Sequence, residues 1–426
     1  MLMTMSRRAY AARVSLGAGI VVAAVALQLV RQPGSRTWNT VWAEDGFVFT
    51  ADSYTKPAWS IFEGYAGYAH VVPRLLVLPV RILPVSAVAA YLAIVSALVG
   101  TLLALFIVRS MSGWIDSTAQ RVLVGLMAVL APVSAFEVTA NVANLAWLLV
   151  FAAFWAVVSQ RRGAVDVGLR ALVMSLAALT TPVAVLVLPW AIVIVAVRRR
   201  RDDVIVVASL LVSLAVQWLA IQAFGRVTAF TGSTVRELPE EYGVRVLGSA
   251  VFGERLLDPL WRHLGLAVIV LALAIAVAFV LAARPLHLPR EQQLLAAGAL
   301  VASGVTFGWV VWERGTELLR LHGGEWNSSG SRYAVVPVLL LVVALAVLAD
   351  RASRRWLRTT LVVQGLLVIA LSLGQQNPRS LGPAWSSEID RARQVCTASD
   401  ASRIATVQLA PEPLDLQMSV PCVRLR

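Results

Sequence analysis

The stretch VLVGLMAVLAPVSAFEVTANVANLAWLLVFAAFWAVV, residues 122–158, carries a single charged residue, Glu137. A continuous helix of this length rises about 1.5 Å per residue and overshoots the ~30 Å hydrocarbon layer of a membrane. Pro132, Asn141 and Asn144 mark a turn within it. The stretch therefore predicts two membrane-spanning helices joined by a short polar turn.

The rest of the 426-residue chain has the same apolar character. Hydrophobic residues make up 58% of it, charged residues 14%, and the mean hydropathy is +0.75. These values exclude an ordinary soluble domain and a disordered chain. We expect an all-α polytopic membrane protein with about eleven transmembrane helices, located at about 14–30, 85–108, 122–158 (two), 171–197 (two), 204–224, 264–282, 294–312, 334–349 and 359–373.

Charge distribution orients these helices. Residues 171–197 can form one long span or two short ones broken at Thr180, Thr181 and Pro182, and the hairpin keeps the Arg198–Arg201 cluster in the cytoplasm. With the hairpin, most of the net charge of +13 lies on short cytoplasmic segments. We interpret it as the positive-inside signature and expect no nucleic-acid partner. The expected location is the plasma membrane, with a cytoplasmic amino terminus and an extracytoplasmic carboxyl terminus.

Two domains are predicted. Residues 1–375 form the transmembrane domain, whose first external loop covers about 31–84, and residues 376–426 form a short extracytoplasmic tail. The chain's two cysteines, Cys396 and Cys422, both lie in this tail. We expect a disulfide that adds roughly 3 kcal/mol, with two free thiols as the alternative. Residues 404–409 and 414–420 read as short strands.

The first external loop is dense in aromatic residues, which favours short helices lying in the membrane interface. Its WAEDG segment places Glu44 and Asp45 side by side. Either carboxylate can act as a general base on a hydroxyl, while the other orients it or holds a cation. The alternative for this pair is a helix cap or a solvated acidic turn.

Basic and aromatic side chains offer two candidate phosphate sites. Arg74 with His70 follows Tyr65 and Tyr68 in the first loop, and Arg332 with His322 precedes a later span beside Tyr333. Guanidinium groups bind phosphate in a bidentate manner, and helix starts attract anions. The alternatives are arginines that reach lipid headgroups or anchor the chain at the interface.

Glu137, Asn141 and Asn144 lie in the turn between the two helices of residues 122–158. Polar groups at this depth are costly and usually have a partner. They can line a substrate cavity and bind sugar hydroxyls, or the asparagines can serve only as helix caps.

The pattern resembles the GT-C class of membrane glycosyltransferases. The residues that carry the resemblance are WAEDG at 42–46, GYAGYAHVVPR at 64–74, FEVTANVANLAW at 136–147 and SRY at 331–333. The resemblance implies a polyprenyl-phosphate sugar donor, delivered through membrane lipid, and an extracytoplasmic glycan or lipid acceptor. It also implies an inverting displacement with a carboxylate base, and leaves the need for a divalent cation open. The alternative function is a transporter or flippase of lipid-linked saccharides.

Overall fold

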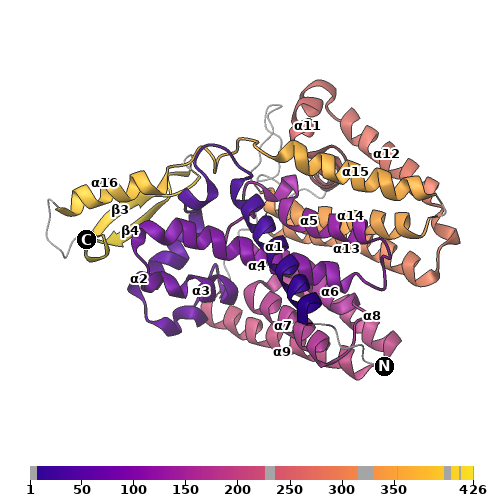
Figure 1. Cartoon of the computed structure of the whole chain (residues 1–426), viewed down its shortest axis with the longest axis horizontal. Coiled ribbons are helices and arrows are strands. Elements are labelled where there is room, and N and C mark those ends of the chain that lie inside the picture. Colours follow the sequence, from indigo (N-terminus) through magenta and orange to yellow (C-terminus); the bar gives the residue numbers. More distant parts are fainter. Residues whose placement is uncertain are drawn as a thin grey trace.

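The protein is represented by a computed structural model, which describes residues 7–225, 236–314, 330–352, 354–397, 404–411 and 414–425. A helical bundle carries a small lobe at one end (Figure 1). The helices of the bundle are α1 (Arg7–Val30), α4 (Val88–Ser110), α5 (Thr118–Leu130), α6 (Leu145–Val158), α7 (Ala164–Thr180), α8 (Leu188–Arg198), α9 (Arg201–Phe224), α12 (Ala267–Ala283), α13 (Arg290–Arg314), α14 (Arg332–Arg351) and α15 (Arg355–Ser372).

Helices α6 and α14 form the centre of the bundle. Both are apolar around their whole circumference and almost all of their side chains are buried, including Phe151, Trp155 and Leu339. Helices α9 and α12 are equally apolar, yet they expose large side chains such as Trp218 and Val270. A helix that is apolar on every face must be covered by protein or by lipid. The exposed apolar helices therefore mark this chain as a membrane protein.

Six helical segments among the described residues are long and apolar enough to cross a membrane. They are Val85–Ser110, Arg201–Phe224, Ala267–His287, Arg290–Glu313, Arg332–Arg351 and Arg355–Ser372. Shorter apolar helices are Ser15–Val30, Thr118–Ser134, Leu145–Val158 and Pro182–Arg198. The all-α bundle is thus confirmed, and the number of eleven spans stays a prediction.

The chain reverses direction after α7. Thr181 is extended and its side chain accepts a hydrogen bond from the backbone N–H of Val183, which opens the short helix η7 (Pro182–Val187). Proline is favoured at a first helical position because it lacks an N–H. Arg198, at the end of α8, donates to the carbonyls of Val158 and Ser159 at 2.8 and 2.9 Å. Two helices joined by a reversal are therefore present, and their assignment as two membrane spans stays a prediction.

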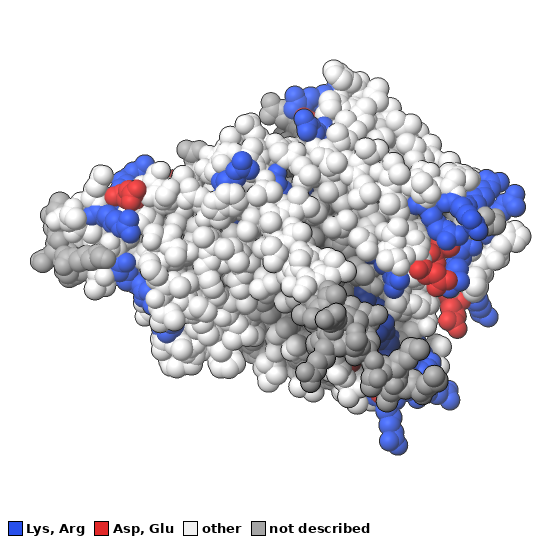
Figure 2. All heavy atoms as spheres, viewed as in Figure 1, with Lys and Arg blue, Asp and Glu red and all other residues white. Residues whose placement is uncertain are grey.

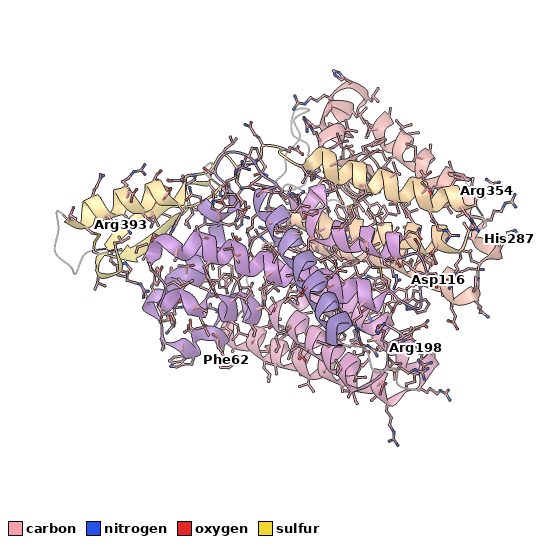
Figure 3. All side chains as sticks on the ribbon, viewed as in Figure 1. Phe62, Asp116, Arg198, His287, Arg354 and Arg393 are labelled. Carbon is pink, nitrogen blue, oxygen red and sulfur yellow. A yellow bond between two sulfur atoms is a disulfide. The ribbon has the colours of Figure 1, made fainter. Side chains whose placement is uncertain are left out.

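Charged side chains gather at the end of the bundle away from the lobe (Figure 2). Figure 3 places Arg198, His287, Arg354 and Asp116 at this end and Arg393 at the opposite one. Between the two ends, the face drawn in Figure 2 carries few charged residues. Arg198 and Arg354, which belong to arginine clusters that the topology assigned to one side of the membrane, thus lie at the same end of the molecule.

The first loop folds into short helices, as its sequence predicts. They surround a small antiparallel hairpin of β1 (Gly64–Tyr65) and β2 (Tyr68–Ala69). The helices are η1 (Thr37–Asn39), η2 (Asp45–Thr50), α2 (Ala51–Thr55), η3 (Ala58–Phe62), α3 (Val71–Val77), η4 (Leu78–Arg81) and η5 (Val85–Ala87). Further short elements of the chain are η6 (Pro132–Ser134), α10 (Leu238–Tyr242), η8 (Gly243–Gly248), α11 (Ser249–Leu264) and η9 (Pro285–His287).

The carboxyl-terminal tail forms the lobe in yellow at the left of Figure 1. It contains α16 (Trp385–Thr397), the antiparallel strands β3 (Ile404–Gln408) and β4 (Gln417–Pro421), and η12 (Cys422–Arg424). The predicted disulfide joins Cys396 to Cys422.

The tail and the first loop share one hydrophobic core. Trp385, Val407 and Val420 of the tail pack in the same cluster as Phe49 and Val80 of the loop. The tail therefore gains from the loop the apolar burial that its own short sequence lacks.

Candidate functional site

Glu44 and Asp45 lie where the first loop meets the tail. The backbone of Trp42 forms an isolated parallel bridge with Ala410, in which Ala43 N–H donates to the carbonyl of Ala410 at 2.7 Å. Gly46 follows, and a Cβ there would come within 2.6 Å of the Leu409 side chain. The bridge and this close contact set the position from which the two carboxylates project.

The carboxylate of Asp45 is buried against the turn that precedes α6. Its Oδ2 accepts from the backbone N–H of Val142 at 2.9 Å, and its Oδ1 accepts from that of Ala143 at 2.7 Å. Burial raises the pKa of Asp45 from 3.8 to about 7, although both hydrogen bonds favour the ionised form. Since both oxygens bind backbone donors, Asp45 fastens the loop to the turn.

Glu44 has a different environment. Its side chain is 22% exposed and lines two cavities. Its Oε1 lies 3.9 Å from Nη1 of Arg332, and its Oε2 has no hydrogen-bond partner among the described residues. Of the two adjacent carboxylates, Glu44 is the one available to a bound molecule.

Arg332 opens helix α14 and lies between two carboxylates. Its Nη1 is 3.4 Å from Oε1 of Glu137, and its backbone N–H donates to Oε2 of Glu137 at 3.0 Å. A carboxylate at a helix start is favoured because the first N–H groups have no partner within the helix. Glu137 therefore fixes both the helix start and the guanidinium.

The two asparagines of the turn act partly as caps. Asn141 accepts from the backbone N–H of Asn144 at 3.0 Å, and Asn144 donates to the carbonyl of Glu137 at 3.0 Å. Asn141 is fully buried and lines neither cavity beside Glu44, while Asn144 lines one of them.

The first cavity measures about 140 Å³ and brings together parts of the chain that are far apart in sequence. Most of its wall was expected from the sequence: Glu44, Tyr65, Tyr68, His70, Asn144, Arg332 and Tyr333. The other residues that line it are Phe49, Ala66, Ala143, Ala146, Trp147 and Thr181. Aromatic rings with a few convergent polar groups are typical of a small-molecule site.

Stacking and hydrogen bonds hold the aromatic wall. The rings of Tyr68 and His70 stack at 4.2 Å between centroids, and Nδ1 of His70 is 3.1 Å from the carbonyl of Tyr68. From helix α9, Gln217 both accepts from Ala69 N–H and donates to Ala69 C=O, each at 3.2 Å. Gln217 thus holds the β1–β2 hairpin as a neighbouring strand would.

The second cavity is larger, about 360 Å³, and mostly apolar. It lies between the first loop, the turn before α6, the start of α14 and the tail. Its lining residues are Trp42, Ala43, Glu44, Phe47, Phe136, Glu137, Gly330, Arg332, Pro378, Pro411, Leu414 and Leu416. Glu44 and Arg332 line both cavities.

Two predicted phosphate ligands are not brought to these cavities. Arg74 is 5% exposed and pairs with Asp52 at 3.0 Å, with Phe49 beneath its guanidinium. It lines neither cavity, so this buried ion pair replaces the expected role as a phosphate ligand. His322 lies outside the described residues.

Two buried arginines beside the site, Arg31 and Arg379, do not stand out in the sequence. Arg31 donates to the side chains of Ser134, Thr139 and Ser372, and Arg379 donates to the carbonyls of Thr139 and Ala140 at 2.7 and 3.0 Å. Their sequence positions, just after a helix and in the tail, are those of ordinary surface arginines. Only the fold places both against the turn before α6.

The described residues contain no group of three or more His, Cys, Asp or Glu side chains that could hold a metal ion. The guanidinium of Arg332 supplies a positive charge beside both Glu44 and Glu137.

No protein-family model, curated protein or solved structure matches this chain. Its function must therefore be argued from the site itself.

Proposed function

We propose that this chain is a membrane glycosyltransferase that transfers a sugar from a polyprenyl-phosphate donor to an acceptor hydroxyl. The observation that carries this proposal is that Glu44 and Arg332 form the shared wall of two cavities. The reaction needs a base for the hydroxyl and a positive charge for the leaving phosphate, and these two side chains can supply them.

The first cavity, of about 140 Å³, suits the sugar and phosphate of the donor. Arg332 and His70 offer donors to phosphate oxygens, and the rings of Tyr65 and Trp147 offer faces to a sugar. A small neighbouring cavity of about 30 Å³ shares Tyr68, Trp147, Thr181 and Tyr333 with it, and adds Val183 of η7 and Val310 of α13. Its wall also includes Pro182 of η7 and Glu313 of α13, so this continuation between two bundle elements is of mixed polarity.

The proposed step is a single inverting displacement. Glu44 takes the proton of the acceptor hydroxyl, and the acceptor oxygen forms a bond to the anomeric carbon of the sugar. The bond from that carbon to the phosphate oxygen breaks, and polyprenyl phosphate leaves with the electron pair. Arg332 stabilises the charge that develops on the phosphate. Asp45 and Glu137 position these two groups.

The proposed orientation follows from the arginine-rich end of the bundle. Basic residues favour the cytoplasmic side of a membrane. The end that carries Arg198 and Arg354 (Figure 3) would then be cytoplasmic, and the site would open on the extracytoplasmic side of the plasma membrane. Lipid-linked donors serve that side, where nucleotide sugars are normally absent.

The test is sugar transfer by purified protein in lipid nanodiscs, with labelled polyprenyl-phosphate hexoses and pentoses and a set of glycan and glycolipid acceptors. Glu44→Gln should lower the transfer rate about 10²- to 10⁴-fold while donor binding persists, because only the proton acceptor is lost. Glu63→Gln is the matched control, since Glu63 lies in the same loop but pairs with Lys56 outside both cavities. A chelator arm tests for a divalent cation.

Normal transfer by Glu44→Gln would remove this residue from catalysis. A wild-type protein that uses no donor, yet moves a lipid-linked saccharide between leaflets, would favour the flippase instead.

A further inference from the structure

The larger cavity joins the tail to the proposed reaction centre. Four of its lining residues, Pro378, Pro411, Leu414 and Leu416, come from the tail. They face a wall that includes Trp42 and Phe47 of the first loop and Phe136 of the turn before α6. The tail is therefore one side of a 360 Å³ cavity whose other sides belong to the membrane domain.

Charge is confined to one place in this cavity. Its charged lining residues are Glu44, Glu137 and Arg332, and the guanidinium of Arg332 lies within 3.9 Å of both carboxylates. The remaining residues that line the cavity are aromatic or aliphatic, apart from Gly330. A molecule bound here would meet polar groups at one point and apolar surface elsewhere.

The wall formed by the tail is firmly attached. The backbone N–H of Ala410 donates to the carbonyl of Val41 at 2.9 Å, next to Pro411. Arg379, next to Pro378, donates to Thr139 and Ala140 of the turn and lies 3.3 Å from the hydroxyl of Thr40. These bonds cross from the tail to the loop and to the turn, so they set the width of the cavity.

The two cavities have Glu44 and Arg332 in common, while the rest of their walls comes from different residues. In a direct displacement the acceptor oxygen attacks the sugar carbon from the side opposite to the leaving phosphate. If the donor occupies the first cavity, which Arg332 and His70 line, an acceptor can reach Glu44 from the larger cavity.

We propose that the larger cavity is the acceptor site and that its acceptor is an amphiphile, with an apolar or aromatic group close to the reacting hydroxyl. This inference rests on the proposed function. The hydroxyl lies at Glu44, and the apolar group packs between Trp42, Phe136 and Leu414. A mostly apolar pocket with a few polar groups favours such a molecule over a fully hydrated glycan, because apolar burial supplies its affinity.

The test compares acceptors that differ in one feature. Nanodisc-embedded protein with its donor is offered a free sugar and the matching alkyl glycoside, and the KM of each is measured. Leu414→Ser is the informative variant because Leu414 is 63% exposed, so its replacement should spare folding. Val423→Ser is the matched control, since Val423 is an equally exposed tail residue outside the cavity.

Wild-type protein should favour the alkyl glycoside, and Leu414→Ser should raise the KM of that acceptor by about tenfold. The KM of the free sugar should change little, and Val423→Ser should match wild type for both acceptors. Donor affinity, measured on each preparation, reports on folding.

Two results would overturn the inference while leaving the proposed function intact. One is equal use of both acceptors by wild-type protein, and the other is an unchanged alkyl-glycoside KM in Leu414→Ser. Failure of the proposed function looks different, because wild-type protein would then consume no donor with any acceptor.

Discussion

Two pairs of adjacent charged residues, one at each end of the bundle, are built on the same plan. In each, a buried aspartate accepts hydrogen bonds from two consecutive backbone N–H groups: Asp45 from Val142 and Ala143, and Asp350 from Asp116 and Ser117. Each buried aspartate has a more exposed neighbour, Glu44 or Arg351.

The two neighbours differ in what they face. Glu44 faces two cavities and Arg332, whereas Arg351 pairs with the exposed carboxylate of Asp116 at 2.6 Å. A buried carboxylate that binds two backbone donors is thus a structural device that recurs in this chain. For Asp45, burial and a raised pKa alone would be poor evidence for catalysis, and the surroundings of the neighbouring residue decide the assignment.

The largest expected effect is on stability. Asp45→Ala and Asp350→Ala should each lower the free energy of unfolding by about 3 kcal/mol, because each leaves two buried N–H groups without an acceptor. Thermal unfolding in detergent measures this loss. If Asp45→Ala lowered the free energy of unfolding no more than Glu44→Ala does, the distinction between the buried and the exposed carboxylate would be wrong.

A second prediction concerns pH and Asp45. Its folded-state pKa of about 7 exceeds the ordinary 3.8, so between these values the folded protein binds more protons than the unfolded chain. The stabilising contribution of Asp45 is therefore complete at low pH and declines as pH rises from about 4 to 7. Unfolding temperatures of wild type and Asp45→Asn at pH 5 and 8 provide the measurement. The variant should lose part of the pH dependence, and an identical pH response would contradict the assignment.

The smallest effects are expected at the exposed neighbours. Glu44→Ala and Arg351→Ala should each change the free energy of unfolding by about 1 kcal/mol or less, because partly exposed ion pairs contribute little. Equilibrium or thermal unfolding detects the difference from the aspartate variants. Transfer assays then separate the two variants, since only the change at Glu44 should lower the transfer rate strongly. Equal activity of both variants would leave the two ends functionally alike.

Much of the bundle and part of the site could be predicted from local features. Apolar runs located the helices, and the break at Thr181 and Pro182 located the hairpin. Tyr65, His70 and Arg332 stand out in the sequence because polar groups beside apolar spans are costly and usually have a function. In the structure the three residues line one cavity. Arg74 was an equally strong candidate from the sequence, yet in the structure it forms an ion pair with Asp52.

The sequence by itself determined that this chain is an apolar helical bundle with an aromatic, acidic loop and a disulfide-closed tail, because hydropathy, spacing and cysteine placement act locally along the chain. Tertiary structure alone decided which carboxylate of WAEDG is available, that the tail lines a cavity beside it, and that Arg31 and Arg379 hold the turn before α6. Adjacent side chains point in different directions, and their burial and partners depend on segments hundreds of residues away.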